Sequence, residues 1–177
     1  MVKPIVSIIM GSDSDLPIME EAAKILDSFE IPFALNIFSA HRSPEKLETH
    51  LQKMLTQGIQ VIICGAGAAA HLAGAVASRV QIPVIGVPLA GSPFNGLDAL
   101  LATVQMPGGI PVATVGVGKS GAVNAALLAI QILALGNPLY AEKLAHHRTQ
   151  QKDKIDLKNE SLRVKYSALF KNICFSD

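Results

Sequence analysis

The stretch Ile5-Val6-Ser7-Ile8-Ile9-Met10-Gly11-Ser12-Asp13-Ser14-Asp15 decides the fold class of this 177-residue chain. Its β-branched run from Ile5 to Ile9 predicts a buried strand, and the glycine-led polar segment after it predicts a loop. The next residues are apolar at the spacing of one helix face: Ile18, Ala22, Ile25, Leu26 and Phe29. The stretch therefore predicts a strand, a loop and a helix in that order.

The same alternation of short apolar runs and helical patterns continues along the chain. Further strands are expected at Phe33–Phe38, Val61–Cys64, Val84–Val87 and Val112–Val115. Runs of this kind suit parallel strands that are covered on both faces. Because crossovers between parallel strands are right-handed, the pattern predicts an α/β fold, a doubly wound three-layer αβα sandwich with a central parallel sheet.

The composition indicates one domain that associates with copies of itself. A chain of this length suits a single domain, so we expect residues 1–177 to form one unit with a core at about 4–137. Hydrophobic residues make up 50% of the chain and charged residues 16%, against a usual charged share of about 25%. One small domain does not easily hide so much apolar surface. We therefore expect a homo-oligomer in which the apolar helix Ala122–Leu135 is buried or lies at an interface.

Several other partners and sites are not favoured. A net charge of +1, with two tyrosines and no tryptophan, provides no basic, aromatic surface for nucleic acid. The N-terminus has no signal-type apolar segment and Ala122–Leu135 is too short to span a bilayer, so we expect a cytoplasmic protein without membrane contact. Cys64 and Cys174 belong to no Cys/His cluster, which predicts two reduced thiols and no metal site.

The composition changes after Gly136-Asn137-Pro138, where the chain becomes charged and only scattered residues are apolar. We expect a C-terminal helical arm from about residue 138 to residue 177. Two interpretations of its apolar residues stay open, docking on a neighbouring subunit and a frayed end. These residues are Leu162, Val164, Tyr166, Leu169 and Phe170.

The loop Gly11–Asp15 stands where parallel α/β proteins bind ligands, beyond the carboxyl end of a strand. The helix after it offers free N–H groups and the positive end of its dipole, which favour an anion. Ser12 and Ser14 add hydroxyl donors, and the Asp15 carboxylate is able to accept hydrogen bonds from ribose hydroxyls. The alternative is that Ser14 or Asp15 only caps the helix.

The stretch Phe38–Pro44, Phe-Ser-Ala-His-Arg-Ser-Pro, places a histidine and an arginine at the end of the second strand. An imidazole titrates near neutral pH, which suits His41 for proton transfer. The guanidinium of Arg42 is able to hold a phosphate by two hydrogen bonds. Ser43 and Pro44 predict the start of a helix with the Ser43 hydroxyl as its cap. The alternatives are a structural histidine and a solvated arginine.

A third loop, Gly65–His71, follows the third strand and consists of small residues up to its histidine. Such residues let the backbone approach a flat ring closely and leave N–H groups free for a carboxylate or carbon dioxide. The dinucleotide-binding pattern GxGxxG is absent from the first loop, and the phosphate-binding pattern GxxxxGKS/T is absent as well. NAD and ATP are therefore not favoured as cofactors.

Four motifs occur in order along the chain. They are Gly-Ser-Asp-Ser-Asp at Gly11–Asp15, Ser-Ala-His-Arg at Ser39–Arg42, Gly-Ala-Gly-Ala-Ala-Ala-His-Leu at Gly65–Leu72, and Gln-Met-Pro-Gly-Gly-Ile-Pro-Val at Gln105–Val112. Together they closely resemble the PurE family, the 5-(carboxyamino)imidazole ribonucleotide mutases of bacterial purine synthesis. The resemblance covers about Val6–Leu144, and the first two motifs are highly specific in combination.

The resemblance implies a flavodoxin-like fold, an octamer, and a reaction that needs neither a metal nor ATP. In that reaction a carboxylate moves from the exocyclic nitrogen of aminoimidazole ribonucleotide to ring carbon 4. By resemblance, His41 is the catalytic histidine. Ser12, Asp15 and Arg42 fall on the positions that hold the ribose phosphate part of the substrate. Further residues match site-lining positions: Ser14, Ser39, Ala66, Gly67 and His71.

The chain departs from the usual family pattern at three places. Ala68 stands where the family usually has a second glycine, and Ala73 stands where it usually has proline. Because both residues are small, we expect the loop to survive with altered backbone freedom. The segment Leu89–Phe94 differs from the usual Val-Gln-Ser, so its contribution to the site is open. The last residues extend beyond the usual family end and are assigned no function.

Three alternative functions remain open. An aminoimidazole ribonucleotide carboxylase uses the same fold with free carbon dioxide, but that branch typically has Ser-Ala-His-Lys, and this chain has Arg42. A PurE-like enzyme that carboxylates a pyridine mononucleotide usually carries a long extra N-terminal region, which is not expected here. A mononucleotide-binding module without catalysis explains Ser12, Asp15 and Arg42 equally well but gives His41 and His71 no role.

Overall fold

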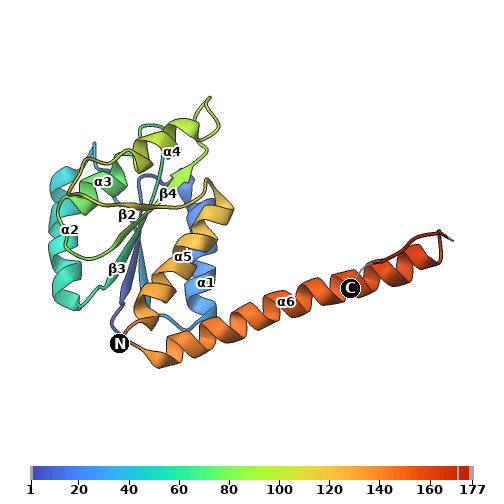
Figure 1. Cartoon of the computed structure of the whole chain (residues 1–177). Coiled ribbons are helices and arrows are strands. Elements are labelled where there is room, and N and C mark those ends of the chain that lie inside the picture. Colours follow the sequence, from blue (N-terminus) through green and yellow to red (C-terminus); the bar gives the residue numbers. More distant parts are fainter. Residues whose placement is uncertain (1, 171, 176–177) are drawn as a thin grey trace.

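The computed structural model describes residues 2–170 and 172–175 and shows a five-stranded parallel sheet between two layers of helices (Figure 1). The strands pair in the order β2-β1-β3-β4-β5. This is the order of flavodoxin-like sheets, and the predicted three-layer αβα sandwich is confirmed. The strand bounds are β1 Val6–Met10, β2 Phe33–Ile37, β3 Val61–Gly67, β4 Val84–Leu89 and β5 Ala113–Thr114.

The helices divide between the two faces of the sheet. One face carries α1 (Leu16–Ser28), which follows the short 3₁₀ helix η1 (Asp13–Asp15), and α5 (Lys119–Ala134). The other face carries α2 (Pro44–Gln57), α3 (Leu72–Ala77) and α4 (Leu97–Val104). Consecutive crossovers therefore cover both faces, as parallel strands with continuous apolar runs require.

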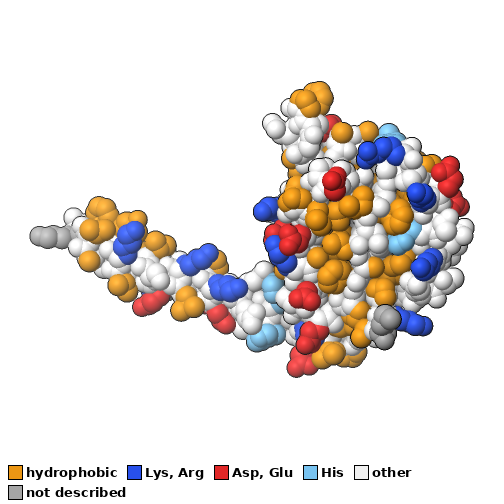
Figure 2. Space-filling view, turned by 180° about the vertical axis from the view of Figure 1, so that it is seen from behind, with side chains coloured by type: hydrophobic (Ala, Val, Ile, Leu, Met, Phe, Trp, Pro, Cys, Tyr) orange, Lys and Arg blue, Asp and Glu red, His pale blue; other side chains and the backbone are white. Residues whose placement is uncertain are grey.

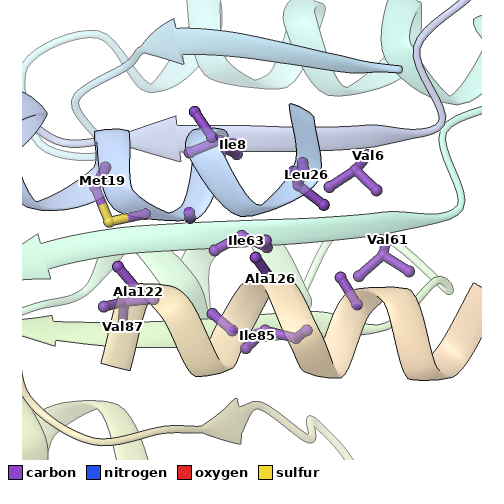
Figure 3. Packing of buried hydrophobic residues seen from close by; sticks show 14 of the residues in the cluster. Val6, Ile8, Met19, Leu26, Val61, Ile63, Ile85, Val87, Ala122 and Ala126 are labelled. Atoms are coloured by element: carbon purple, nitrogen blue, oxygen red, sulfur yellow. The ribbon is translucent and has the colours of Figure 1, made fainter. Parts of the chain in front are cut away.

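The larger core lies between the sheet and helices α1 and α5 (Figure 3). Strand side chains such as Ile8, Ile63 and Ile85 are fully buried there, and α5 meets them with alanines such as Ala122 and Ala126. Small side chains bring the α5 backbone close to the sheet. The helix expected at Ala122–Leu135 thus exists, begins earlier, and buries one face within its own chain.

The expected end of the third strand at Cys64 is wrong. The small residues Gly65–Gly67 continue β3, because they pair in parallel with Val87–Leu89 of an equally extended β4. Weak local β propensity is overridden here by the neighbouring strand. Ala66 and Gly67 therefore belong to a strand end. The fifth strand is, conversely, shorter than the expected Val112–Val115.

The expected cap of α2 is also wrong. The helix begins at Pro44 as predicted, but the Ser43 hydroxyl makes no cap hydrogen bond. It donates instead to the carbonyl oxygen of Ser39 at 3.3 Å. A backbone hydrogen bond of 3.1 Å from the Ser43 N–H to the Ser39 carbonyl closes a turn there. Within this turn the Ser43 hydroxyl bonds to Ser39 and does not cap α2.

The predicted C-terminal arm is present as α6 (Pro138–Ser167), which leaves the body of the molecule and extends away from it (Figure 1). The Asn137 side chain caps it by accepting from the Leu139 N–H at 3.1 Å. Residues 171, 176 and 177 of the expected arm lie outside the described residues. None of the helices in the described part of the chain is long and apolar enough to cross a membrane.

The loop after β3 holds two alanines in the left-handed region of backbone space. Ala68 has φ +52° and Ala70 has φ +44°. A Cβ in this region collides with the following carbonyl group, which costs about 1–2 kcal/mol per residue. The departure from glycine at residue 68 therefore stores strain in the loop beside β3.

We expect Ala68→Gly to raise the free energy of unfolding by up to about 1 kcal/mol. The glycine removes the left-handed strain, and its greater freedom in the unfolded chain offsets only part of that gain. Denaturant unfolding curves measure the difference. Ala66→Gly is the matched control, because Ala66 lies in β3 and outside the left-handed region. Ala66→Gly is expected to lower the free energy of unfolding. An equal decrease in Ala68→Gly would show that the backbone at residue 68 is not strained.

Candidate active site

Loops that follow four neighbouring strands surround one cavity of about 410 Å³ at the carboxyl edge of the sheet. The helices after the adjacent strands β1 and β3, namely α1 and α3, lie on opposite faces of the sheet. This divergence is the topological switch point at which open α/β sheets bind their ligands. The position of the cavity therefore follows from the strand order.

All nine residues predicted for the site line this cavity. They are Ser12, Ser14, Asp15, Ser39, His41, Arg42, Ala66, Gly67 and His71. Six further residues line it as well: Gly11, Ala40, Ala68, Ala70, Leu72 and Gly91. Gly91 belongs to the segment Leu89–Phe94, whose contribution was open from the sequence. Its position just beyond the end of β4 was the available signal, because every other loop of the cavity also follows a strand end.

Backbone hydrogen bonds between adjacent strand ends bring three of the loops together. The Phe38 N–H, directly after β2, donates to the Met10 carbonyl at 2.9 Å. The Gly11 N–H, directly after β1, donates to the Gly65 carbonyl in β3 at 3.2 Å. The loops thus leave the sheet side by side, so residues far apart in sequence face one cavity.

The Gly11–Asp15 loop is closed by a reciprocal pair of hydrogen bonds. The Ser12 N–H donates to the Asp15 carboxylate at 3.0 Å, and the Ser12 hydroxyl oxygen accepts from the Ser14 N–H at 3.4 Å. The Ser14 hydroxyl donates to the Ser12 hydroxyl at 3.1 Å. Capping therefore does occur, but by Ser12 and Asp15 together at η1, and Asp15 makes no cap bond to α1. The pair holds both groups in place before a ligand arrives.

The two carboxyl groups of this loop have opposite electrostatic environments. Burial raises the pKa of Asp15 above its ordinary 3.8, and hydrogen bonds from the Ser12 and Gly11 backbone N–H groups offset part of this effect. The pKa of Asp13 is lowered, chiefly by the Ser12 hydroxyl, with a smaller contribution from the positive charge of Arg42. Asp15 is the desolvated group that lines the cavity, so it is the one whose charge a ligand would meet.

Arg42 is held at its inner end by Ser39. The Ser39 hydroxyl oxygen accepts from the Arg42 backbone N–H at 3.2 Å and from Nε at 3.4 Å. The two terminal nitrogens of this guanidinium donate no hydrogen bond to any of the described residues. The planar fork is therefore available for a bidentate contact with an anion in the cavity.

His41 and His71 form a hydrogen-bonded pair inside the cavity. His41 Nε2 lies 2.7 Å from His71 Nδ1, and the ring planes meet at 70°. One ring must donate and the other accept, so the tautomer of His71 fixes which nitrogen of His41 carries its proton. The two rings come from different loops, after β2 and before α3, and both are exposed to solvent. A histidine with one nitrogen engaged and the other facing a cavity can exchange a proton with a ligand.

The chain is similar to known proteins over most of its length. The family model described as AIR carboxylase matches residues 5–154. A protein from Pyrococcus horikoshii, named N5-carboxyaminoimidazole ribonucleotide mutase, is 52% identical over 90% of this chain and 89% of its own length. Phosphoribosylaminoimidazole carboxylase from Saccharomyces cerevisiae is 46% identical over 97% of this chain but only 30% of its own length. The crystal structure of Treponema denticola PurE superimposes with a TM-score of 0.82 at 31% identity, covering 90% of this chain and 99% of that one.

The fold and the cavity define a doubly wound α/β enzyme with a polar site at its topological switch point. The chain belongs to the AIR carboxylase family, and its resemblance to PurE is confirmed over most of its length. Within the described residues there is no group of three or more histidine, cysteine or acidic side chains that could hold a metal ion.

We expect Asp15→Asn to change stability in a pH-dependent way. The folded protein raises the pKa of Asp15, so wild-type stability falls as pH rises from 3.8 through the folded-state pKa. The asparagine variant lacks this loss. Its free energy of unfolding relative to wild type should therefore be higher at neutral pH than below pH 3.8, as measured by denaturant titration at both pH values.

Asp13→Asn is the matched control with the opposite sign. The pKa of Asp13 is lowered in the folded state, so its carboxylate adds stability that is lost as pH falls. The control variant should therefore be relatively less stable at neutral pH. If the stability of both variants relative to wild type changed with pH in the same direction, the opposite pKa shifts assigned to Asp15 and Asp13 would be contradicted.

Proposed function

We propose that this protein converts 5-(carboxyamino)imidazole ribonucleotide to 4-carboxy-5-aminoimidazole ribonucleotide. The observation that carries the proposal is the His41–His71 pair, with Nε2 and Nδ1 2.7 Å apart, in a cavity that Arg42 also lines. One group moves protons and the other binds phosphate. The names of the relatives that match most of the chain support the same reaction.

The substrate is bound by the loops after β1 and β2. Arg42 takes the phosphate by two charge-assisted hydrogen bonds, and the Ser12 and Ser14 hydroxyls add donors. The desolvated Asp15 carboxylate accepts from the ribose hydroxyls. Because Ser39 and Ser12 already hold the side chains of Arg42 and Asp15, little side-chain freedom is lost on binding.

His41 acts as general acid and then as general base. In the first step it donates its proton to the exocyclic nitrogen as the bond from that nitrogen to the carboxylate breaks, which yields aminoimidazole ribonucleotide and carbon dioxide. Ring carbon 4 then forms a bond to carbon dioxide. Neutral His41 removes the proton from carbon 4, which restores the aromatic ring and the starting state of the enzyme. The hydrogen bond between His41 Nε2 and His71 Nδ1 keeps the imidazole oriented through both proton transfers.

Carbon dioxide has to stay next to the ring between the two steps. The β3 end and the following loop supply small side chains there, Ala66, Gly67, Ala68 and Ala70, all of which line the cavity. Residues of this size let the flat ring approach the backbone closely. We assign this part of the cavity to carbon dioxide.

An ATP-free assay with 5-(carboxyamino)imidazole ribonucleotide at low bicarbonate tests the reaction. The mutase produces 4-carboxy-5-aminoimidazole ribonucleotide under these conditions. The relatives named phosphoribosylaminoimidazole carboxylase make free carbon dioxide the second candidate carboxyl source. Product formed only from aminoimidazole ribonucleotide and added bicarbonate would identify a carboxylase. If neither substrate gave product, the protein would be a mononucleotide-binding module without catalysis.

We also infer that the protein works as an octamer in the cytoplasm. The apolar composition and the resemblance to PurE support this assembly, as do exposed apolar side chains on α4, including Leu97 and Leu101. Sedimentation equilibrium at micromolar concentration tests it. A fully active species at the monomer mass of 18.7 kDa would rule out the octamer.

We expect His41→Asn to lower kcat by a factor of about 10²–10⁴, because asparagine keeps a polar group of similar size but cannot carry the proton. Binding of aminoimidazole ribonucleotide should change little, and calorimetric titration measures it. His146→Asn, on the exposed side of α6, is the control and should keep full activity. Turnover of His41→Asn within tenfold of wild type would show that His41 is not the proton carrier.

We expect Arg42→Lys to weaken binding of aminoimidazole ribonucleotide by about tenfold or more. The charge remains, but one of two charge-assisted hydrogen bonds is lost, each worth about 1.5–3 kcal/mol. Calorimetric titration gives the affinity. The control is Arg79→Lys, whose parent side chain pairs with Glu48 outside the cavity. Equal affinity in wild type and Arg42→Lys would remove Arg42 from the phosphate position.

A further inference from the structure

The Ser39–Ser43 turn carries His41 and Arg42 and is fixed at both of its ends. Directly before the turn, the Phe38 N–H donates to a carbonyl group of β1 at 2.9 Å. Directly after it, helix α2 begins at Pro44. The positions of His41 and Arg42 therefore depend on how α2 packs against the end of β2.

One side chain of α2 packs on that strand end. The ring of His50 lies 4.3 Å from the ring of Phe38, measured between centroids, with the two planes at 33°. Phe38 also packs against the core layer beneath α2. The contact between Phe38 and His50 thus joins the strand just before the turn to the helix just after it.

The imidazole of His50 suits this place only as a neutral group. It is half-buried, and its Nε2 atom is fully buried and finds no hydrogen-bond partner within the described part of the chain. Burial lowers the pKa of His50 below its ordinary 6.5, and the positive charge of Lys53 adds to this effect. A proton on Nε2 would place a charge where nothing accepts its hydrogen bond, and the fold opposes this state.

Helix α2 places positive but no negative charge beside His50. Lys46 and Lys53 stand four residues before and three residues after it, on the same side of the helix. The acidic residues of α2 are Glu45 and Glu48, and the helical period turns both away from His50. Glu48 pairs instead with the arginine after α3 at 3.4 Å. A protonated His50 would meet like charges on its own helix.

Strand β2 supplies no charge either. Its side chains on the face toward α2 near the strand end are Asn36 and Phe38, which alternate along the strand and do not titrate. The Asn36 Oδ1 atom is buried and accepts no hydrogen bond from the described residues. Because His50 makes no bond to it from its present position, a protonated imidazole would have to leave the Phe38 ring to reach this oxygen or the solvent.

We propose that His50 is a positioning residue for the proposed reaction. Neutral His50 holds the Ser39–Ser43 turn in the geometry in which His41 and Arg42 line the cavity. Protonated His50 leaves the ring of Phe38, which frees α2 from the strand end and lets the turn move. The site thereby has an acid limit that belongs neither to His41 nor to the substrate. The effect on turnover rests on the proposed function, whereas the effect on the turn does not.

His147 on α6 offers a matched control, because its surroundings are of the same kind but outside the cavity. Its ring lies 5.3 Å from that of Phe29, and its buried Nε2 also has no hydrogen-bond partner among the described residues. Burial lowers the pKa of His147, and the charges of Arg148 and Lys154 add to this. Figure 2 shows histidine side chains at the surface both on the body and near the start of the projecting arm.

Three kinds of variant separate positioning from stability. His50→Phe and His50→Tyr keep an aromatic ring on Phe38 and remove the titration, whereas His50→Ala removes both. His147→Phe is the control. A histidine whose folded-state pKa is lowered costs stability as pH falls from 6.5 through that pKa, so the aromatic variants at both sites should gain stability over wild type there. Circular dichroism defines the pH range in which every variant is folded.

The ratio of kcat/KM in wild type to that in the aromatic His50 variants is the first readout, and substrate titration cancels in it. We expect a constant ratio above pH 6.5. It should fall to about half at the pKa of His50, which histidine NMR measures, and by about tenfold for each further pH unit. The ratio to His147→Phe should not change with pH. His50→Ala should lose most activity even at pH values above 6.5.

The second readout needs no turnover. In wild type, the NMR signals of the His41 ring should shift a second time at the pKa of His50, and this inflection should be absent from the aromatic His50 variants. A ratio that stays constant with pH, or that changes equally for His147→Phe, would overturn the proposal. Full activity of His50→Ala would do so as well. A protein without turnover that keeps the second inflection would contradict only the proposed reaction, and an active protein without it only the role of His50.

Discussion

The parallel pairing of β1 with both β2 and β3 is the constraint on which the rest of the structure depends. Because all strands run the same way, the loops after β1, β2 and β3 emerge at one edge of the sheet. Because α1 and α3 leave to opposite faces, a space opens between these loops. The His41–His71 contact exists only in this arrangement, since the two rings are thirty residues apart and come from loops after different strands.

Much of the fold and of the site follows from local patterns. The β-branched runs identified all five strands, since an apolar run flanked by glycine and polar loops suits a covered parallel strand. Ser12, His41 and Arg42 were chosen because they follow two of these runs, and in the structure all three line one cavity. These features need only the sequence because they depend on residue type and chain direction.

Features that depend on tertiary contacts could not be predicted in this way. The extension of β3 through Gly67 is stabilised by β4, although glycine and alanine favour a loop. The Ser43 hydroxyl had two possible partners, an N–H group of α2 that it could cap and the Ser39 carbonyl to which it could donate. Only the geometry of the Ser39 turn decides between them. Gly91 carries no functional group, so its place in the cavity depends on where β4 ends.

The cavity also contains features that disfavour folding. Asp15 is partly desolvated, and Ala68 and Ala70 hold the left-handed backbone conformation in the loop after β3. In the core, by contrast, Ile8, Ile63 and other strand side chains are fully buried. Strain and desolvation tend to be retained where they orient a ligand and are compensated by a well-packed core.

Strand register links that core to the chemistry. Successive side chains of a strand point to opposite faces, so a slip of β2 by one residue would turn Ala34 and Phe38 out of the core beneath α2. The same slip would break the hydrogen bond from Phe38 to Met10 and move the whole Ser39–Arg42 turn along the edge of the sheet. His41 would then lose its 2.7 Å contact with His71, whose position is set independently by β3 and α3. Apolar packing far from the cavity therefore determines whether the two imidazoles meet.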